Sequence, residues 1–174
     1  MTYKEEFITF MVRSGVLTFG DFTTKSGRKT PYFINTGNYK TGAQAAKLGD
    51  YYAACIQENL PDGVTCLFGP AYKGIPLAVT AGTAVRESIE LFKHVAKVNM
   101  KALIVSVDRM ERGTKDCSTL DELRQDHGIA VYPIVTVREI IAFLHNREID
   151  GKVYIDDEMK GRMEAYLAEY GPRG

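Results

Sequence analysis

The chain has 174 residues, enough for one domain with a buried core, and its 45% hydrophobic and 25% charged residues are usual for a soluble globular protein. Its 22 basic and 22 acidic residues cancel, so the formal net charge of zero argues against a general nucleic-acid binder. No apolar run is long enough to span a bilayer, and the first residues do not have the pattern of a signal peptide. The cysteines, at positions 55, 66 and 117, lack paired spacing, which predicts reduced thiols in a cytoplasmic protein.

The first 40 residues have the pattern of a helix followed by a hairpin. Thr2 and Glu5 form a capping box before apolar residues at helical spacing. Residues 16–24 and 32–35 are β-rich, and we expect residues 26–31 to join them as a turn. The basic residues in or beside this turn are Lys25, Arg28 and Lys29. Turn residues are usually solvated, so we favour solvent exposure for these three side chains over a role in binding.

Strands and helices alternate through the rest of the chain. Thr41 and Gln44 form a capping box for a second helix, and residues 102–107 (ALIVSV) are apolar on both faces, as in a parallel strand covered by helices. The other expected strands are 64–68 and 129–135, and the other helices are 119–127, 136–146 and one from Asp156 or Asp157 to Gly171. This order predicts an α/β fold with a mostly parallel sheet, which binds ligands at the carboxyl ends of its strands.

Several charged residues follow these strands, and each has two interpretations. Lys73 lies in an expected loop after strand 64–68, with glycines on both sides of it. Its side chain could bind phosphate oxygens there or be solvated. Arg109 and Arg112 follow strand 102–107, where a guanidinium could bind a carboxylate through two hydrogen bonds or pair with a neighbouring acid such as Asp108 or Glu111.

Two further groups of polar residues carry weaker signals. Asp156 and Asp157 could bind Mg²⁺ or ribose hydroxyls, but no phosphate loop follows them, so capping of the last helix is favoured. His94, His127 and His145 have no metal-ligand spacing, and we predict no protein-bound metal site and give these histidines no role.

Taken together, four segments resemble the orotate phosphoribosyltransferase family in the right order. The segments are FGDFTTKSGRKTPYFINTG from residue 19, FGPAYKGIPLAVT from residue 68, AGTAVRES from residue 81 and ALIVSVDRMERG from residue 102. The resemblance implies the type I phosphoribosyltransferase fold, a Rossmann-like sheet with an N-terminal hood. It also implies one domain, 1–174, with the hood at 1–40 and the α/β core at 41–174.

The same resemblance implies an enzyme of pyrimidine (UMP) biosynthesis that transfers phosphoribosyl from phosphoribosyl pyrophosphate to orotate, with Mg²⁺ held mainly by substrate phosphates. The positions that match orotate contacts are Lys25, Phe33, Ile34, Thr80 and Arg109. The positions that match phosphoribosyl pyrophosphate contacts are Tyr72, Lys73, Ala81, Gly82, Thr83 and Ala84. Family members are homodimers, so we expect a homodimer here.

The chain departs from the family between Val79 and Ala81. Relatives have two strands, a basic mobile loop and an acidic pair there, and this chain has none of them, so its catalytic residues stay unassigned. Without a preceding strand, we expect residues 75–93 to form one helix, in which the phosphate-binding amides are used internally and transfer is lost or nearly so. The alternative function is a non-catalytic remnant that binds orotate or a nucleotide, or that only dimerises.

Overall fold

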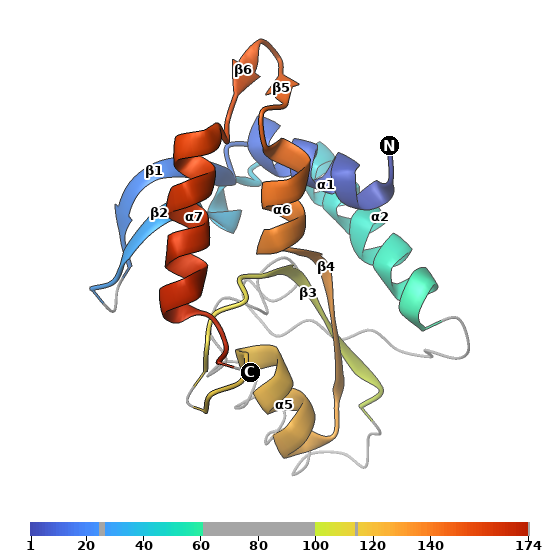
Figure 1. Cartoon of the computed structure of the whole chain (residues 1–174). Coiled ribbons are helices and arrows are strands. Elements are labelled where there is room, and N and C mark those ends of the chain that lie inside the picture. The colour runs from blue at the N-terminus through green and yellow to red at the C-terminus, as the bar shows by residue number, and fades with distance from the viewer. Residues whose placement is uncertain (25–26, 61–99, 114, 174) are drawn as a thin grey trace.

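The fold places a parallel strand pair among helices, with the N-terminal hairpin lying beside the last helix (Figure 1). This computed structural model describes residues 1–24, 27–60, 100–113 and 115–173. Two of the expected elements, strand 64–68 and the helix over residues 75–93, lie outside the described residues. The parallel pair, the surrounding helices and the N-terminal helix and hairpin agree with the predicted α/β fold.

The two N-terminal helices begin where the sequence places them. Helix α1 (Tyr3–Arg13) has a capping box in which the Thr2 side chain accepts the Glu5 N–H and the Glu5 carboxylate accepts the Thr2 N–H. Helix α2 (Gly42–Asn59) has the same arrangement at Thr41 and Gln44. Each box satisfies N–H groups that have no partner within the helix, so the start of each helix is encoded locally.

The hairpin is confirmed, but its second strand begins earlier than expected. Strand β1 (Leu17–Thr23) pairs antiparallel with β2 (Lys29–Ile34), so part of the predicted turn belongs to the strand. Pro31 made that segment look like a turn, because proline cannot donate a hydrogen bond to a neighbouring strand. In the structure the register shifts between Phe19 and Phe22, and Pro31 faces this bulge, where no ladder hydrogen bond from its nitrogen is needed.

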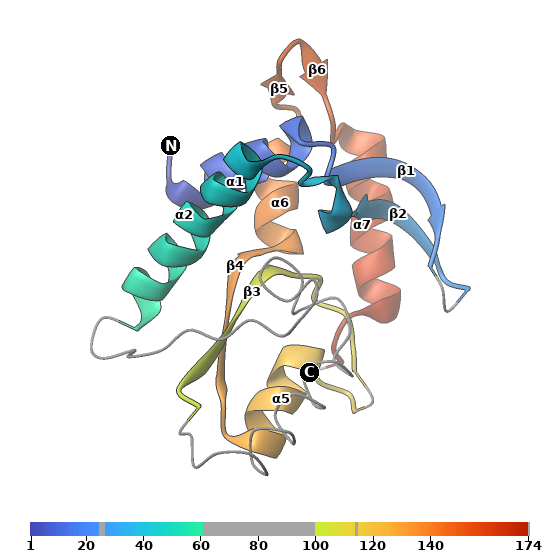
Figure 2. The same cartoon turned by 180° about the vertical axis from the view of Figure 1, so that it is seen from behind.

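The parallel pair consists of β3 (Ala102–Asp108) and β4 (Ala130–Thr136), with helices packed on both faces. On one face, Val105 and Val131 pack against Leu123 of α5 (Thr119–His127). On the other face, Ile134 belongs to the main core, which also contains residues of α1 and α2. Figure 2 shows α1 and α2 together from behind. This arrangement confirms that strand 102–107 is covered by helices, as its apolar composition predicts.

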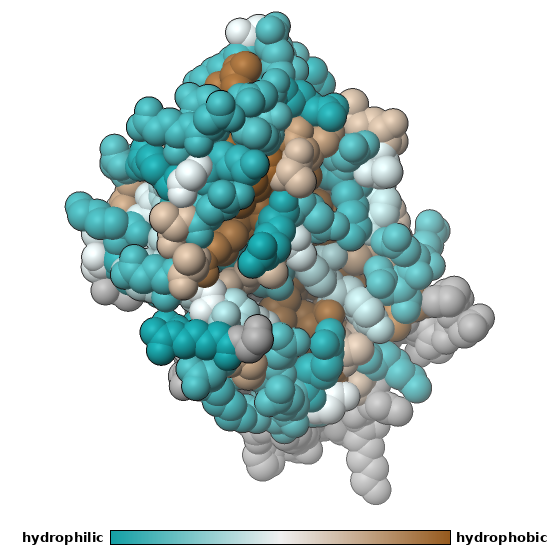
Figure 3. Space-filling model, viewed as in Figure 1, coloured by the Kyte–Doolittle hydropathy of each residue, from teal (hydrophilic) through white to brown (hydrophobic). Residues whose placement is uncertain are grey.

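The last third of the chain closes the core over the hairpin. Helix α6 (Val137–Leu144) starts at a third capping box, at Thr136 and Glu139, and ends two residues earlier than expected. The short strands β5 (Glu148–Ile149) and β6 (Lys152–Val153) lead to α7 (Asp157–Tyr170), which packs against β2. Figure 3 shows mostly hydrophilic side chains over the face of the molecule that carries α6 and α7, with an apolar strip between these two helices.

Candidate functional site

Arg109 follows β3 directly, at the carboxyl end of a parallel strand. Asp108 Oδ1 accepts a hydrogen bond from the Met110 N–H at 2.7 Å, and Met110 adopts a left-handed backbone conformation with φ of 54°. Within this tight turn the Arg109 side chain reaches the hairpin, and its guanidinium carbon lies 5.2 Å from the centre of the Tyr32 ring. Burial of the turn raises the pKa of the Asp108 carboxyl. The chain thus delivers a cation to the position where open parallel sheets bind ligands.

The charge on Arg109 is maintained in spite of its burial. Burial works to lower the pKa of the guanidinium, but Tyr32 and Glu111 outweigh it, and the pKa is raised. Burial has the opposite consequence for Tyr32, whose pKa rises because the phenolate form is desolvated. Arg109 therefore remains a charged group beside Tyr32 and Glu111.

Glu111 lies between Arg109 and two other elements. Its Oε1 lies 2.6 Å from Arg109 Nη2 and accepts a hydrogen bond of 2.8 Å from the Tyr166 hydroxyl of α7. Its Oε2 lies 3.6 Å from Arg28 Nη2, at the start of the hairpin's second half. The Glu111 carboxylate thereby connects the end of β3 with both the hairpin and the last helix.

Two donors of Arg109 are left without a hydrogen bond. Although Oε1 of Glu111 is close to Nη2, it does not lie in line with an N–H, and neither Nε nor Nη2 has a partner in hydrogen-bonding geometry among the described residues. A buried N–H without an acceptor is unfavourable, and Nε with Nη2 forms one edge of the guanidinium fork that a carboxylate matches. The ion pair with Glu111, one of the two interpretations from the sequence, is therefore present. The two unbonded donors are compatible with the other interpretation, a carboxylate ligand, which stays a prediction.

Phe33 and Ile34, two of the positions expected to contact orotate, are adjacent in β2 but differ in environment. Phe33 is 40% exposed, and its ring lies 5.5 Å from that of Phe22 at an angle of 28°. Ile34 is half-buried and packs against the main core. Successive residues of a strand point to opposite faces, so Phe33 lies on the other face of β2 from Tyr32 and its contact with Arg109. Within the described chain, the structure leaves the Phe33 ring accessible but does not stack it on the Arg109 guanidinium.

Three of the other basic residues singled out from the sequence lie within the described residues, and they have different surroundings. Arg28 is not simply solvated as expected, because its guanidinium carbon lies 5.4 Å from the centre of the Tyr170 ring and its Nη2 approaches Glu111. Lys29 is exposed and donates a hydrogen bond of 3.2 Å to Thr23 Oγ1. Arg112 binds the end of α7, since its N–H donates to Tyr170 O at 2.7 Å and its Nη2 donates to Glu169 O at 3.2 Å.

No pattern in the sequence indicated that Tyr166 lies beside Arg109 and Glu111. Tyr166 and Tyr170 lie one helical turn apart in α7, with ring centres 4.9 Å apart. This spacing is visible in the sequence and indicates an aromatic face on the last helix, but it does not identify the partner of that face. The partner is Tyr32, whose ring meets Tyr166 edge to face at 5.9 Å.

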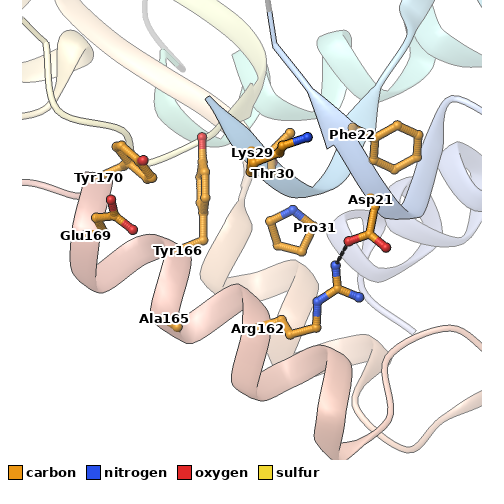
Figure 4. A pocket seen from close by; sticks show the side chains of 10 residues that line it. All are labelled: Asp21, Phe22, Lys29, Thr30, Pro31, Arg162, Ala165, Tyr166, Glu169 and Tyr170. Atoms are coloured by element: carbon orange, nitrogen blue, oxygen red, sulfur yellow. Dashed lines mark hydrogen bonds and ion pairs between the residues drawn. The ribbon is translucent and has the colours of Figure 1, made fainter. Parts of the chain in front are cut away.

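A groove of about 310 Å³ runs between the hairpin and α7 (Figure 4). The ion pair between Arg162 and Asp21 crosses one end, and Tyr166 and Tyr170 stand at the other. Pro31 forms part of the wall between them. Tyr166 therefore borders this groove and also holds Glu111.

Two aspartates mark the start of α7, and the capping role that the sequence favours is present at Asp156. Asp156 caps the helix by accepting the Met159 N–H at 2.8 Å. Asp157 lies 2.7 Å from His145 Nε2, and the hydrogen bond from that ring is the main reason that the pKa of Asp157 is lowered. Neither aspartate approaches a group of metal ligands in the described part of the chain.

Most of the expected binding residues lie outside the described residues. These are Lys25, Tyr72, Lys73, Thr80, Ala81, Gly82, Thr83 and Ala84. In the part of the chain that the structure covers, no three or more His, Cys, Asp or Glu side chains gather as a metal site. Over the same residues, no helix has the length and apolar character needed to cross a membrane.

Comparison with known proteins connects this site to a family. The chain is 43% identical to the orotate phosphoribosyltransferase of Clostridium beijerinckii, with 98% of this chain and 99% of that protein covered. It is 44% identical to that of Clostridium acetobutylicum, with 97% and 98% covered. The crystal structure of orotate phosphoribosyltransferase from Francisella tularensis matches with a TM-score of 0.79 and 31% identity, covering 95% of this chain and 99% of that one. No family model matches the chain.

The length of these alignments also bears on the missing segment. The alignment with the Clostridium beijerinckii protein extends over 221 positions, whereas this chain has 174 residues, so a long gap falls on this chain's side. The chain nevertheless matches that relative over nearly its whole length. The chain belongs to the orotate phosphoribosyltransferase family and lacks an internal segment that its relatives possess.

Proposed function

We propose that this protein binds orotate and acts as an orotate phosphoribosyltransferase in pyrimidine biosynthesis. The observation that carries the proposal is the edge of the Arg109 guanidinium, with Nε and Nη2 unbonded, at the carboxyl end of β3 in a chain of this family. Orotate has one carboxylate, and a planar fork of two N–H donors matches it in shape and charge.

The proposed reaction joins orotate to the sugar of phosphoribosyl pyrophosphate. A ring nitrogen of orotate forms a bond to the anomeric carbon and releases its proton as the bond to pyrophosphate breaks, giving orotidine 5′-monophosphate and pyrophosphate. Arg109 fixes the carboxylate and thereby orients the ring, and Phe33, Ile34, Lys25 and Thr80 complete the orotate site in this proposal. Orientation of this kind lowers the barrier without any covalent step by the protein.

The second substrate and its metal follow from the same resemblance. The proposed contacts of phosphoribosyl pyrophosphate are Tyr72, Lys73 and the segment Ala81, Gly82, Thr83 and Ala84. Mg²⁺ would be held by the oxygens of the substrate's phosphates, because the described residues contain no cluster of acids or histidines that fits a resident ion. When bound, the ion neutralises charge on the departing pyrophosphate.

Orotate binding is the first test. Arg109→Ala should weaken orotate binding by about 1.5–3 kcal/mol, the worth of hydrogen bonds to a charged group, measured by isothermal titration calorimetry. Arg13→Ala is the matched control, because Arg13 also pairs with a carboxylate, that of Asp150, but on an exposed surface of α1. Equal orotate affinities for the Arg109 variant and the wild type would remove the carboxylate role.

Turnover is the second test, and it addresses the missing segment. Consumption of orotate with phosphoribosyl pyrophosphate and Mg²⁺ would establish transferase activity in the shortened chain. Orotate binding without turnover is the outcome expected if residues 75–93 form one continuous helix, because its amides could not then bind the 5′-phosphate.

The proposal also includes the assembly of the protein. We treat residues 1–174 as one domain, with the hood at 1–40 and the core at 41–174, and we expect a cytoplasmic homodimer with the reduced thiols Cys55 and Cys117. The apolar side of α1 is used within the chain, since Phe7 and Ile8 are at most 1% exposed, so the dimer expectation rests on the family and not on this helix. Analytical ultracentrifugation at high micromolar concentration tests it, and a monomer would contradict it.

A further inference from the structure

Glu111 has contacts that a solvated loop acid would not have. Its side chain is only 16% exposed, and it lies between the guanidinium of Arg109, the hydroxyl of Tyr166 and the guanidinium of Arg28. The Tyr166 hydroxyl donates to the same Oε1 that lies closest to Arg109, so α7 fixes that oxygen beside the guanidinium. The carboxylate position is therefore set by the fold and not by solvent.

The contact between Glu111 and Arg109 supplies charge without consuming the donors. The two charged atoms are 2.6 Å apart, yet Nε and Nη2 of Arg109 make no hydrogen bond with any described residue. A second carboxylate that binds this edge must therefore enter within a few ångströms of the first one. Two like charges at such separation in a partly buried site repel each other appreciably.

We propose that Glu111 is the internal counter-ion of Arg109 and that it lowers the affinity of the site for the carboxylate of its ligand. Glu111 neutralises the half-buried guanidinium in the ligand-free protein, where an uncompensated charge would be unfavourable. The same negative charge opposes an incoming carboxylate, so Glu111 sets how tightly the ligand is held. This inference rests on the proposed function, which places the orotate carboxylate at Arg109.

Replacing the charge alone tests the inference. Glu111→Gln keeps the size of the side chain and an oxygen that can accept the Tyr166 hydroxyl. We expect this variant to bind orotate about tenfold more tightly than the wild type, by calorimetry, and to unfold at a lower temperature. Uracil, which is orotate without the carboxylate, should bind the wild type and Glu111→Gln with the same affinity. A purely structural role of Glu111 would not change the affinity for orotate while leaving the affinity for uracil unchanged.

Two further variants separate charge from position. Tyr166→Phe removes the hydroxyl that fixes Glu111 but keeps the carboxylate, so orotate should bind this variant less tightly than it binds Glu111→Gln, because the negative charge remains. Equal orotate affinities of these two variants would contradict the inference. Glu111→Asp tests the same inference if Glu111→Gln does not fold. It keeps the charge but draws the carboxylate back by one methylene, and orotate should bind it about threefold more tightly.

The outcomes distinguish this inference from the proposed function. If the wild type binds orotate through Arg109 but Glu111→Gln binds it equally or more weakly, the counter-ion does not compete with the ligand and the inference is wrong. If neither protein binds orotate, the proposed function and the inference both fall. Tightening of orotate and uracil alike would also overturn the inference, because the effect would not depend on the carboxylate.

Discussion

Tyr32 and Tyr166 offer a matched pair of substitutions with different expected effects on stability. Their rings meet edge to face, and both side chains are buried, at 0% and 5% exposure. The Tyr166 hydroxyl donates to Glu111 at 2.8 Å, whereas the Tyr32 hydroxyl lies near the Arg109 guanidinium but has no partner in hydrogen-bonding geometry among the described residues. Replacement of each tyrosine by phenylalanine keeps the ring contact and removes only the hydroxyl.

The structure sets the size of each effect. Tyr166→Phe removes a hydrogen bond to a charged group and should lower the free energy of unfolding by about 1.5–3 kcal/mol. In a domain of this size that corresponds to a fall of about 3–12 °C in the melting temperature. Tyr32→Phe removes a buried hydroxyl that makes no bond, so the melting temperature should stay constant or rise by a few degrees.

Thermal unfolding followed by circular dichroism measures both effects. Urea titration gives the free energies independently and shows whether the slope with denaturant is unchanged. Equal decreases in stability for the two variants would refute the reasoning, because they would mean that the two hydroxyls do not differ in their bonding.

Three further substitutions test other parts of the fold. Gly113→Ala should lower the free energy of unfolding by about 1–3 kcal/mol, measured by urea titration. The Cβ of the introduced alanine would lie 2.4 Å from the carboxyl carbon of the fully buried Glu122. Met163→Ala should cost about 2–5 kcal/mol in the same assay, because Met163 is completely buried in the core. Burial acts to raise the pKa of Glu139, but the bond from Lys4 and other donors lower it below 4.5, so its contribution to stability is present above pH 4.5 and is lost as the pH falls through the lowered pKa. Glu139→Gln should therefore flatten the acid dependence of the melting temperature.

The sequence predicted the helix starts well because they depend on neighbouring residues. The capping boxes at Thr2, Thr41 and Thr136 each involve a residue three positions later, and all three are present. The helix end near Asn146 was two residues too far, since no comparable local signal marks Leu144 as the last residue. The turn before β2 was too long because the sequence does not show that Pro31 faces a bulge.

The surroundings of Arg109 could be predicted only in part. The sequence places an arginine after a strand and an acid two residues later, and this gave both the carboxylate role and the possible ion pair with Glu111. It could not show that Tyr166, 55 positions beyond Glu111, donates a hydrogen bond to that acid, or that Arg28 approaches it from the hairpin. These contacts arise when α7 packs on β2, and no pattern within either segment encodes the pairing.

The packing of α7 on the hairpin has a consequence for how the protein is made. The hairpin is complete at Ile34, but the helix that covers β2 begins at Asp157, near the end of the chain. At roughly 5–20 residues per second, a ribosome needs on the order of ten seconds to synthesise the intervening segment. During that interval the inner face of β2, with Tyr32, has no α7 to pack against. The surroundings of Arg109 can therefore form only after α7 has been synthesised.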